Sequence, residues 1–136
     1  MELTKVVDEH GFGCYPPQDY TGIWEVYWPN GVIKSRNRYI DGKEEGEQLC
    51  FWDNGNLAQV GQAKNGHCIG LWEDFSYEGL RFKETDYYSD GNFQNRFYDP
   101  IGNLYSISEW SNDRPRKAKN FFVNTYLKIW RLIFYR

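Results

Sequence analysis

Residues 22–45 read GIWEVYWPNGVIKSRNRYIDGKEE, and residues 46–69 repeat the pattern as GEQLCFWDNGNLAQVGQAKNGHCI. The interval is 24 residues from Gly22 to Gly46, and 24 again from Gly46 to Gly70. Each copy contains an aromatic-rich run, a glycine turn, a second run and another glycine turn. Such a repeat predicts stacked supersecondary units, each of which buries its apolar face only against its neighbours.

The turns of the repeat predict short β-hairpins. The first turn of each copy is PNG at 29–31, DNG at 53–55 and YEG at 77–79, and the second is DG at 41–42, NG at 65–66 and DG at 90–91. Asn-Gly supplies the positive φ angles of the primed two-residue turns, so the first two turns are strong hairpin signals. Connections this short make each strand antiparallel to the one before it.

The later copies are less regular. The third copy begins at Gly70 and is one residue longer than the others, and we expect a β-bulge near Arg81 to absorb this residue. A fourth, worn copy reads FYDPIGNLYS from Phe97. Together the copies predict an antiparallel meander of seven or eight strands over residues 22–108.

Alternation along the strands aligns equivalent residues of successive copies in columns. The three columns are Tyr27, Phe51 and Phe75; Trp24, Gln48 and Trp72; and Trp28, Trp52 and Ser76. The aromatic content of 19% favours a sheet held together by large side chains. Because apolar residues occupy both faces, the sequence leaves open which column forms the core.

The two ends of the chain differ from the repeats, although 136 residues fit one domain. Residues 1–21 are a lead-in, in which Leu3–Val7 is a candidate strand that caps the first edge of the sheet. Residues 109–136 are basic, and we expect an amphipathic helix over 116–134, with strand as the alternative because aromatic and β-branched residues weaken helix propensity. The helix would carry apolar residues at Phe122, Tyr126, Ile129, Trp130 and Ile133.

The charge is distributed unevenly along the chain. The formal net charge is −3, but residues 1–112 carry −9 and residues 113–136 carry +6. An acidic sheet repels nucleic acid and anionic lipid and attracts a basic partner, so we expect no nucleic-acid binding. Three roles remain possible for the basic end from the sequence: it docks on the acidic sheet, it lies on a membrane surface, or it binds a partner or a second copy of the chain.

Three cysteines without CxxC spacing, Cys14, Cys50 and Cys68, predict reduced thiols and a cytoplasmic location. The N-terminal residues show no basic segment followed by an apolar run, so we expect no secretory signal. No stretch of about 18 apolar residues occurs, and we expect no helix that spans a bilayer.

The hairpin unit resembles MORN repeats, and more closely the MORN-variant repeats of the bacterial YwqK-type proteins. The matching residues of the first copy are Gly22, Trp24, Tyr27, Trp28, Asn30, Gly31, Tyr39, Asp41, Gly42 and Gly46. Those of the second are Gly46, Phe51, Trp52, Asn54, Gly55, Asn65, Gly66 and Gly70. Gln48 and Ser76 depart from the pattern. The resemblance implies an elongated, single-layer antiparallel meander of hairpin repeats used for binding, and many YwqK-type proteins look like antitoxins or immunity proteins.

No pattern of catalytic or metal-binding residues is present. Glu25 and Glu73 occupy equivalent positions, but the repeat explains their recurrence, and we interpret them as part of a solvated face. The two histidines, His10 and His67, lack metal-ligand spacing. We therefore expect a protein that is not an enzyme and that uses neither a metal nor a cofactor.

The aromatic columns beside acidic residues are the candidate partner-binding surface, since Trp and Tyr dominate interface hot spots. The candidate residues are Trp28, Trp52, Asp53, Trp72, Glu73 and Asp74. Our leading hypothesis is a bacterial immunity protein or antitoxin that occludes a basic toxin. The alternative is a peripheral membrane or scaffold protein that acts through residues 113–136. The sequence leaves the oligomeric state open.

Overall fold

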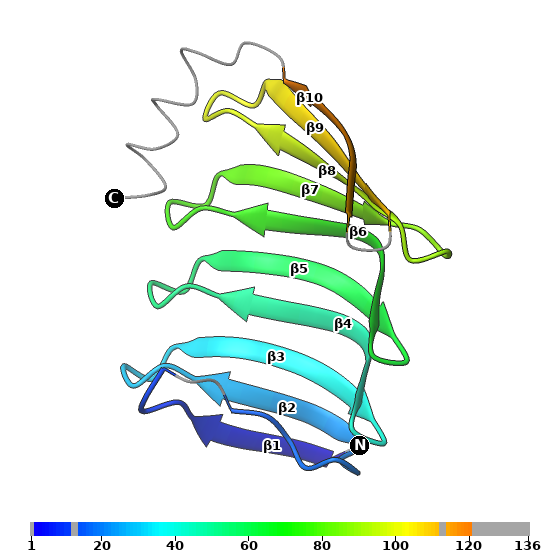
Figure 1. Cartoon of the computed structure of the whole chain (residues 1–136). Helices are drawn as coiled ribbons and strands as arrows, with labels where there is room; N and C mark the ends of the chain where they lie inside the picture. The colour runs from blue at the N-terminus through cyan, green and yellow to red at the C-terminus, as the bar shows by residue number, and fades with distance from the viewer. Residues whose placement is uncertain (1, 12–13, 112–113, 121–136) are drawn as a thin grey trace. The chain divides into compact units, whose positions relative to one another are not determined.

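The computed structural model describes residues 2–11, 14–111 and 114–120, the last without their side chains (Figure 1). The regular elements of these residues are all β-strands, so the predicted mostly β meander is confirmed, while its elongation stays a prediction. The chain divides into two compact units, Met1–Ile69 and Gly70–Arg136, which we call unit 1 and unit 2.

Unit 1 contains the lead-in strand and the first two copies of the repeat. Its strands are β1 (Glu2–Val7), β2 (Gly22–Tyr27), β3 (Ile33–Ile40), β4 (Lys43–Phe51) and β5 (Leu57–Lys64). Strands β2 to β5 are antiparallel neighbours, as expected. The predicted strand at the first edge is confirmed as β1, which pairs with β2 in parallel because residues 8–21 return the chain to the start of β2.

The core of unit 1 lies on the Trp24 face of the sheet. It consists of Tyr20, Trp24, Val26 and Tyr39, all buried. The Tyr20 and Trp24 rings meet edge to face at 5.2 Å, and the Trp24 indole N–H donates to the Cys14 carbonyl at 3.1 Å. The lead-in therefore covers this face as well as the edge, and the column of Trp24 and Gln48 forms the core.

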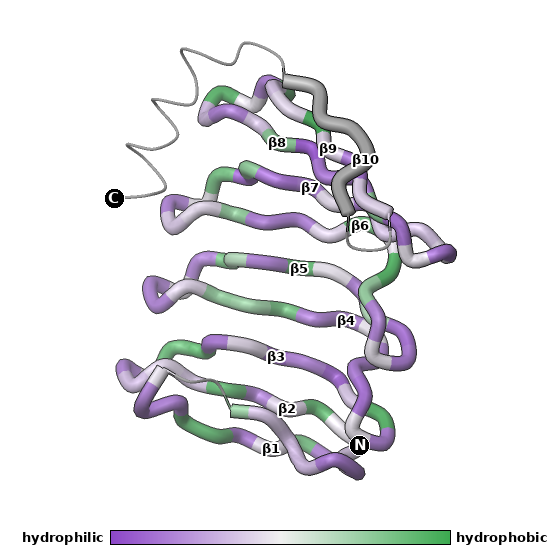
Figure 2. Tube along the Cα trace, viewed as in Figure 1, coloured by the Kyte–Doolittle hydropathy of each residue, from purple (hydrophilic) through white to green (hydrophobic). Residues whose placement is uncertain are grey.

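Unit 2 has a core ladder of aromatic rings. Its strands are β6 (His67–Phe75), which spans the boundary, β7 (Arg81–Tyr87), β8 (Phe93–Tyr98), β9 (Leu104–Ser111) and β10 (Arg114–Asn120). Trp72 meets Tyr87 edge to face at 6.2 Å, Tyr87 lies 5.4 Å from Phe93, and Phe93 stacks on Trp110 at 5.8 Å. The ladder thus joins β6, β7, β8 and β9. Figure 2 shows short apolar stretches among mainly hydrophilic residues along the strands.

The hairpins are present where the sequence predicts them, but their turns are of two kinds. At the first turn Trp28 N–H donates to Val32 at 2.8 Å, Gly31 N–H donates to Trp28 at 2.9 Å, and Gly31 has φ of 87°. This is a three-residue loop with a glycine bulge rather than the primed two-residue turn that we predict there. The primed turns are the second ones, where positive φ occurs at both residues: Asp41 and Gly42, and Asn65 and Gly66.

The bulge expected near Arg81 is present, but it does not absorb the extra residue of the third copy. Phe75 pairs with Arg81 and Asp74 with Lys83, so the register shifts there. The same shift recurs after the first turn of the other hairpins, between Val26 and Tyr27, Cys50 and Phe51, and Phe97 and Tyr98. The extra residue instead lengthens the turn at 88–92, where Tyr88 N–H donates to Asn92 at 2.9 Å.

The C-terminal helix prediction is wrong for residues 116–120. These residues belong to β10, which pairs antiparallel with β9 and shifts register between Pro115 and Lys117. An available sheet edge outweighs local helix propensity, and a register shift accommodates the proline. The rest of the predicted helix lies outside the described residues. Within the described residues, no helix is long and apolar enough to cross a membrane.

The Gly42 turn generates a stability prediction. A Cβ on Gly42 would lie 1.8 Å from the Gln18 carbonyl oxygen, whereas one on Gly55 would have nothing within 4 Å, although φ is positive at both. We expect Gly55→Ala to cost about 1 kcal/mol from backbone strain and Gly42→Ala about 2 kcal/mol more. Urea denaturation measures both, and equal losses would contradict the close approach of the lead-in.

Candidate functional site

Three of the predicted site residues lie together at the first turns of unit 1. Trp28 is half-buried; its indole N–H donates to the Phe51 carbonyl at 3.1 Å. Trp52 has 36% of its surface exposed. Asp53 is an exposed turn residue, and its carbonyl accepts a hydrogen bond from the Asn30 amide at 2.9 Å. Of the two tryptophans, Trp52 is therefore the better candidate for contact with a partner.

The other three predicted residues belong to unit 2 and do not form one exposed surface. Trp72 is buried in the aromatic ladder. Adjacent strand residues point to opposite faces, so Glu73 lies on the other side of β6, where its carboxylate is 3.5 Å from the Arg81 guanidinium. Asp74 lies on the Trp72 face and is half-buried. A partner that reaches Glu73 cannot reach Trp72 from the same side.

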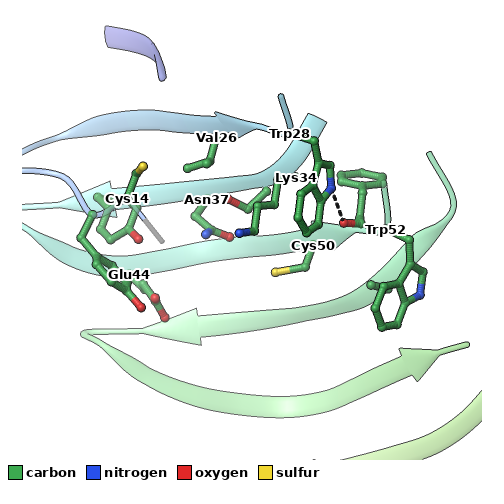
Figure 3. A pocket seen from close by; sticks show the side chains of 13 residues that line it. Cys14, Val26, Trp28, Lys34, Asn37, Glu44, Cys50 and Trp52 are labelled. Carbon is green, nitrogen blue, oxygen red and sulfur yellow. Dashed lines mark hydrogen bonds between the residues drawn. The ribbon is translucent and has the colours of Figure 1, made fainter. Parts of the chain in front are cut away.

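A groove of about 370 Å³ lies on the Trp24 face of unit 1 (Figure 3). Its lining includes Trp28 and Trp52, as well as residues that sequence reasoning did not select. The main additions are Tyr15, Lys34, Asn37, Tyr39, Glu44 and Cys50. In Figure 3, Cys14 and Glu44 lie at one end of the groove and Trp52 at the other. This size and mainly apolar lining with a few polar groups are typical of binding sites.

Polar groups gather around the Tyr39 hydroxyl in the groove. Burial, followed by the negative charge of Glu44, raises the pKa of Tyr39 to about 12, and an opposing hydrogen bond with Asn37 is smaller in effect. The hydroxyls of Tyr15 and Tyr39 also interact electrostatically. Tyr39 therefore remains protonated at neutral pH and can donate or accept a hydrogen bond.

Glu44 is the acidic residue of this groove. Within the residues that the structure describes, its carboxylate has no ion pair and no side-chain hydrogen bond. Loss of solvent around the half-buried group raises its pKa above the ordinary value of 4.5. The groove thus holds a negative charge that the surrounding described residues do not neutralise.

Lys34 supplies the positive charge of the lining, but this charge is already engaged. Its ammonium lies 2.6 Å from the buried Asp8 carboxylate and 4.4 Å from the centre of the Trp28 ring. Asp8 also accepts a hydrogen bond from the Gly11 N–H at 2.9 Å. The charges of Lys34 and Asp8 therefore neutralise each other.

The interpretation of Glu25 as part of a solvated face is wrong. Glu25 is only 6% exposed, and its carboxylate lies 2.9 Å from the Arg36 guanidinium and 3.3 Å from the Tyr27 hydroxyl. Arg36 is its direct partner across the β2–β3 hairpin. The signal was available in the sequence, because counting outward from the first turn places opposite charges on facing residues.

A second hollow, of about 420 Å³, lies within unit 2 beside the fourth-copy turn. Its cationic residue, Arg81, is paired with Glu73 and Glu84 and lies 4.7 Å above the Tyr98 ring. Tyr98 in turn donates a hydrogen bond to Glu84. These charges stabilise the sheet among themselves, so the hollow offers less to a charged ligand than the groove of unit 1.

The described residues contain no cluster of three or more His, Cys, Asp or Glu side chains that could hold a metal ion. The three cysteines, which all lie in the described part of the chain, form no disulfide.

Glu44 generates a prediction about stability and pH. The folded-state pKa of Glu44 is raised because folding disfavours the charged carboxylate. The free energy of unfolding is therefore at its full value below about pH 4.5, and part of it is lost as the pH rises through the folded pKa. We expect Glu44→Gln to be more stable than the wild type at pH 7, by roughly 0.5 kcal/mol or less after solvent screening. The advantage should vanish at pH 4. Urea denaturation at both pH values is the measurement.

The matched control is Glu47→Gln, which changes an exposed carboxylate on the opposite face of the same strand. It should leave the free energy of unfolding at pH 7 nearly unchanged, because it alters only an exposed surface residue. A Glu44→Gln protein less stable than the wild type at pH 7 would mean that the carboxylate has a stabilising partner.

Comparison with known proteins gives one match. Residues 20–41 and 44–65 each match the family model described as MORN repeat variant. No curated protein and no solved structure matches the chain. MORN repeats are often protein-binding or membrane-associated modules. The two copies whose strands line the groove of unit 1 are thus the segments that are similar to MORN repeat variants.

Proposed function

We propose that this protein is a non-enzymatic binding module whose partner is a basic protein. The observation that carries the proposal is the groove of unit 1, which combines exposed aromatic surface with the un-neutralised carboxylate of Glu44. Residues 1–69 contain six lysines and arginines and ten aspartates and glutamates, a formal charge of −4. Such a surface attracts a basic partner and places aromatic anchors at the contact.

The finer form of the proposal is a bacterial immunity protein or antitoxin that occludes a cognate toxin in the cytoplasm. Proteins that act on nucleic acid carry basic surfaces, and an acidic groove complements them. Thiols without disulfides fit a reducing compartment. The same acidic character disfavours nucleic acid as a ligand.

A non-enzymatic role is consistent with how the carboxylates are used. Glu25 is committed to Arg36, and Glu73 shares Arg81 with Glu84. General acid–base catalysis needs a side chain with a shifted pKa that can reach the substrate, and a second titratable side chain in the complementary role. Glu44 has the access, but its interacting neighbour Tyr39 stays protonated at neutral pH.

The alternative function is a peripheral membrane or scaffold protein that works through residues 113–136. The observation in its favour is the +6 formal charge of that segment together with its aromatic residues. Sedimentation with anionic lipid vesicles tests it, using the intact chain and a chain that ends at Asn112. Lipid binding that is lost with the truncation would favour this function.

Capture from the source cells followed by co-expression tests the leading proposal. The intact chain should retain one stoichiometric basic protein, identified by mass spectrometry, and co-expression should relieve the toxicity of that protein. Failure of the intact chain to retain or neutralise any protein would overturn the proposal.

Trp52 generates a prediction about affinity. Trp52→Ala should weaken partner binding about thirtyfold, the effect of losing an interface hot spot. Trp52→Phe, which keeps a ring, should recover much of the affinity. The matched control is Ile101→Ala in unit 2, which changes a residue that is 74% exposed and does not line the groove. Calorimetric titration measures the affinities, and equal affinities of wild type and Trp52→Ala would remove Trp52 from the interface.

A further inference from the structure

We propose that the groove of unit 1 receives an arginine side chain of the partner, with the guanidinium paired to the Glu44 carboxylate. This inference rests on the proposed protein-binding function and specifies the chemistry by which the partner is recognised. It follows from the charge of the groove, the polar groups around Glu44 and the length of the groove.

The charge of the groove selects a cation. Lys34 and Asp8 neutralise each other at 2.6 Å, which leaves Glu44 as the net charge of the site. Within the described residues, the Glu44 carboxylate lacks a cationic partner. A partly desolvated carboxylate without a partner is unfavourable, and its raised pKa is consistent with that cost. A bound guanidinium would remove the cost and form charge-assisted hydrogen bonds.

The surroundings of Glu44 suit a guanidinium better than a small hydrated ion. The Tyr39 hydroxyl, which interacts electrostatically with both Glu44 and Tyr15, provides a further acceptor in the groove. Tyr15 is 81% exposed, so its ring is available at the rim of the groove. A planar guanidinium donates several N–H groups at once and stacks on aromatic rings, whereas an ammonium does neither as well.

The length of the groove indicates that the arginine belongs to an extended protein segment. Glu44 lies near the start of β4 and Trp52 just after its end, and β4 has nine residues. The register with β3 shifts between Asn37 and Tyr39, so that Glu44 faces Tyr39 and Cys50 faces Ser35. At about 3.3 Å per residue, Glu44 and Trp52 are therefore separated by about 20 Å. Figure 3 shows these residues at opposite ends of the groove. A free guanidinium compound would fill one end, but a partner segment would place an arginine at Glu44 and an apolar side chain at Trp52.

A direct titration of the full chain tests the arginine site. The probe is N-acetyl-arginine methylamide, and its neutral isostere is the corresponding citrulline compound. NMR titration should show saturable shifts at the backbone amides of Glu44, Tyr39 and Tyr15 with the arginine probe. The citrulline probe, or Glu44→Gln with the arginine probe, should bind at least about tenfold more weakly, and Glu47→Gln should bind like the wild type. Equal binding of the two probes, or no binding of either, would overturn the site.

The partner experiment separates this inference from the proposed function. Glu44→Gln should weaken binding of the captured basic protein about tenfold or more, and Glu47→Gln should not. If the partner binds Glu44→Gln as tightly as the wild type, the arginine site is wrong and the binding function stands. If the wild type binds no partner but binds the arginine probe through Glu44, the site stands as a guanidinium site and the proposed function falls. Thermal unfolding of each variant confirms that it is folded.

Discussion

The hydrogen bond from the Trp28 indole to the Phe51 carbonyl represents the interaction on which the repeat depends. An isolated two-stranded hairpin is at best marginally stable in water. Each copy must therefore be tied to the next, and this bond, with that from Asn30 to the Asp53 carbonyl, joins the first turns of successive copies. Strand pairing between β3 and β4 supplies the backbone part of the same connection. The two tryptophans before the first turns of unit 1 are thus structural first, and of the two, Trp52 is the one with substantial exposure.

The need to hold neighbouring strands together also explains how charged residues are distributed on the sheet. On the face opposite the core, facing residues of neighbouring strands carry opposite charges, as in the Glu25–Arg36 pair. In unit 2, Arg96 lies 2.5 Å from Asp86 and 3.8 Å from Glu84. Charges paired in this way stabilise the sheet and leave little unpaired charge to bind a ligand. Glu44 differs because it faces the groove, where the nearby cation is already bound to Asp8.

Much of the fold follows from sequence, because glycine turns and period-two alternation are local signals. The hairpins, the alignment of Trp24 with Gln48 and β1 were predictable on that basis. The identity of the core face was not, because it depends on Tyr20 and the lead-in, which pack there from outside the repeat. Strand β10 was mispredicted for a similar reason, since its conformation depends on a neighbouring edge. The groove escaped prediction because Tyr15, Lys34 and Glu44 meet only through the lead-in and two hairpins.

The groove lies where the sequences of the two copies in unit 1 differ. This difference allows a repetitive sheet to carry one distinct candidate site. At the next repeat position, 24 residues on, Asn37 is replaced by Gly61 and Glu44 by Cys68. Tyr15 comes from the lead-in and has no equivalent in the second copy. A groove with the same backbone at the second copy would therefore lack the carboxylate and its polar neighbours. The parts that the two copies share maintain the sheet, and the parts that differ confine the negative charge to one place, where the proposed basic partner would be recognised in a single register.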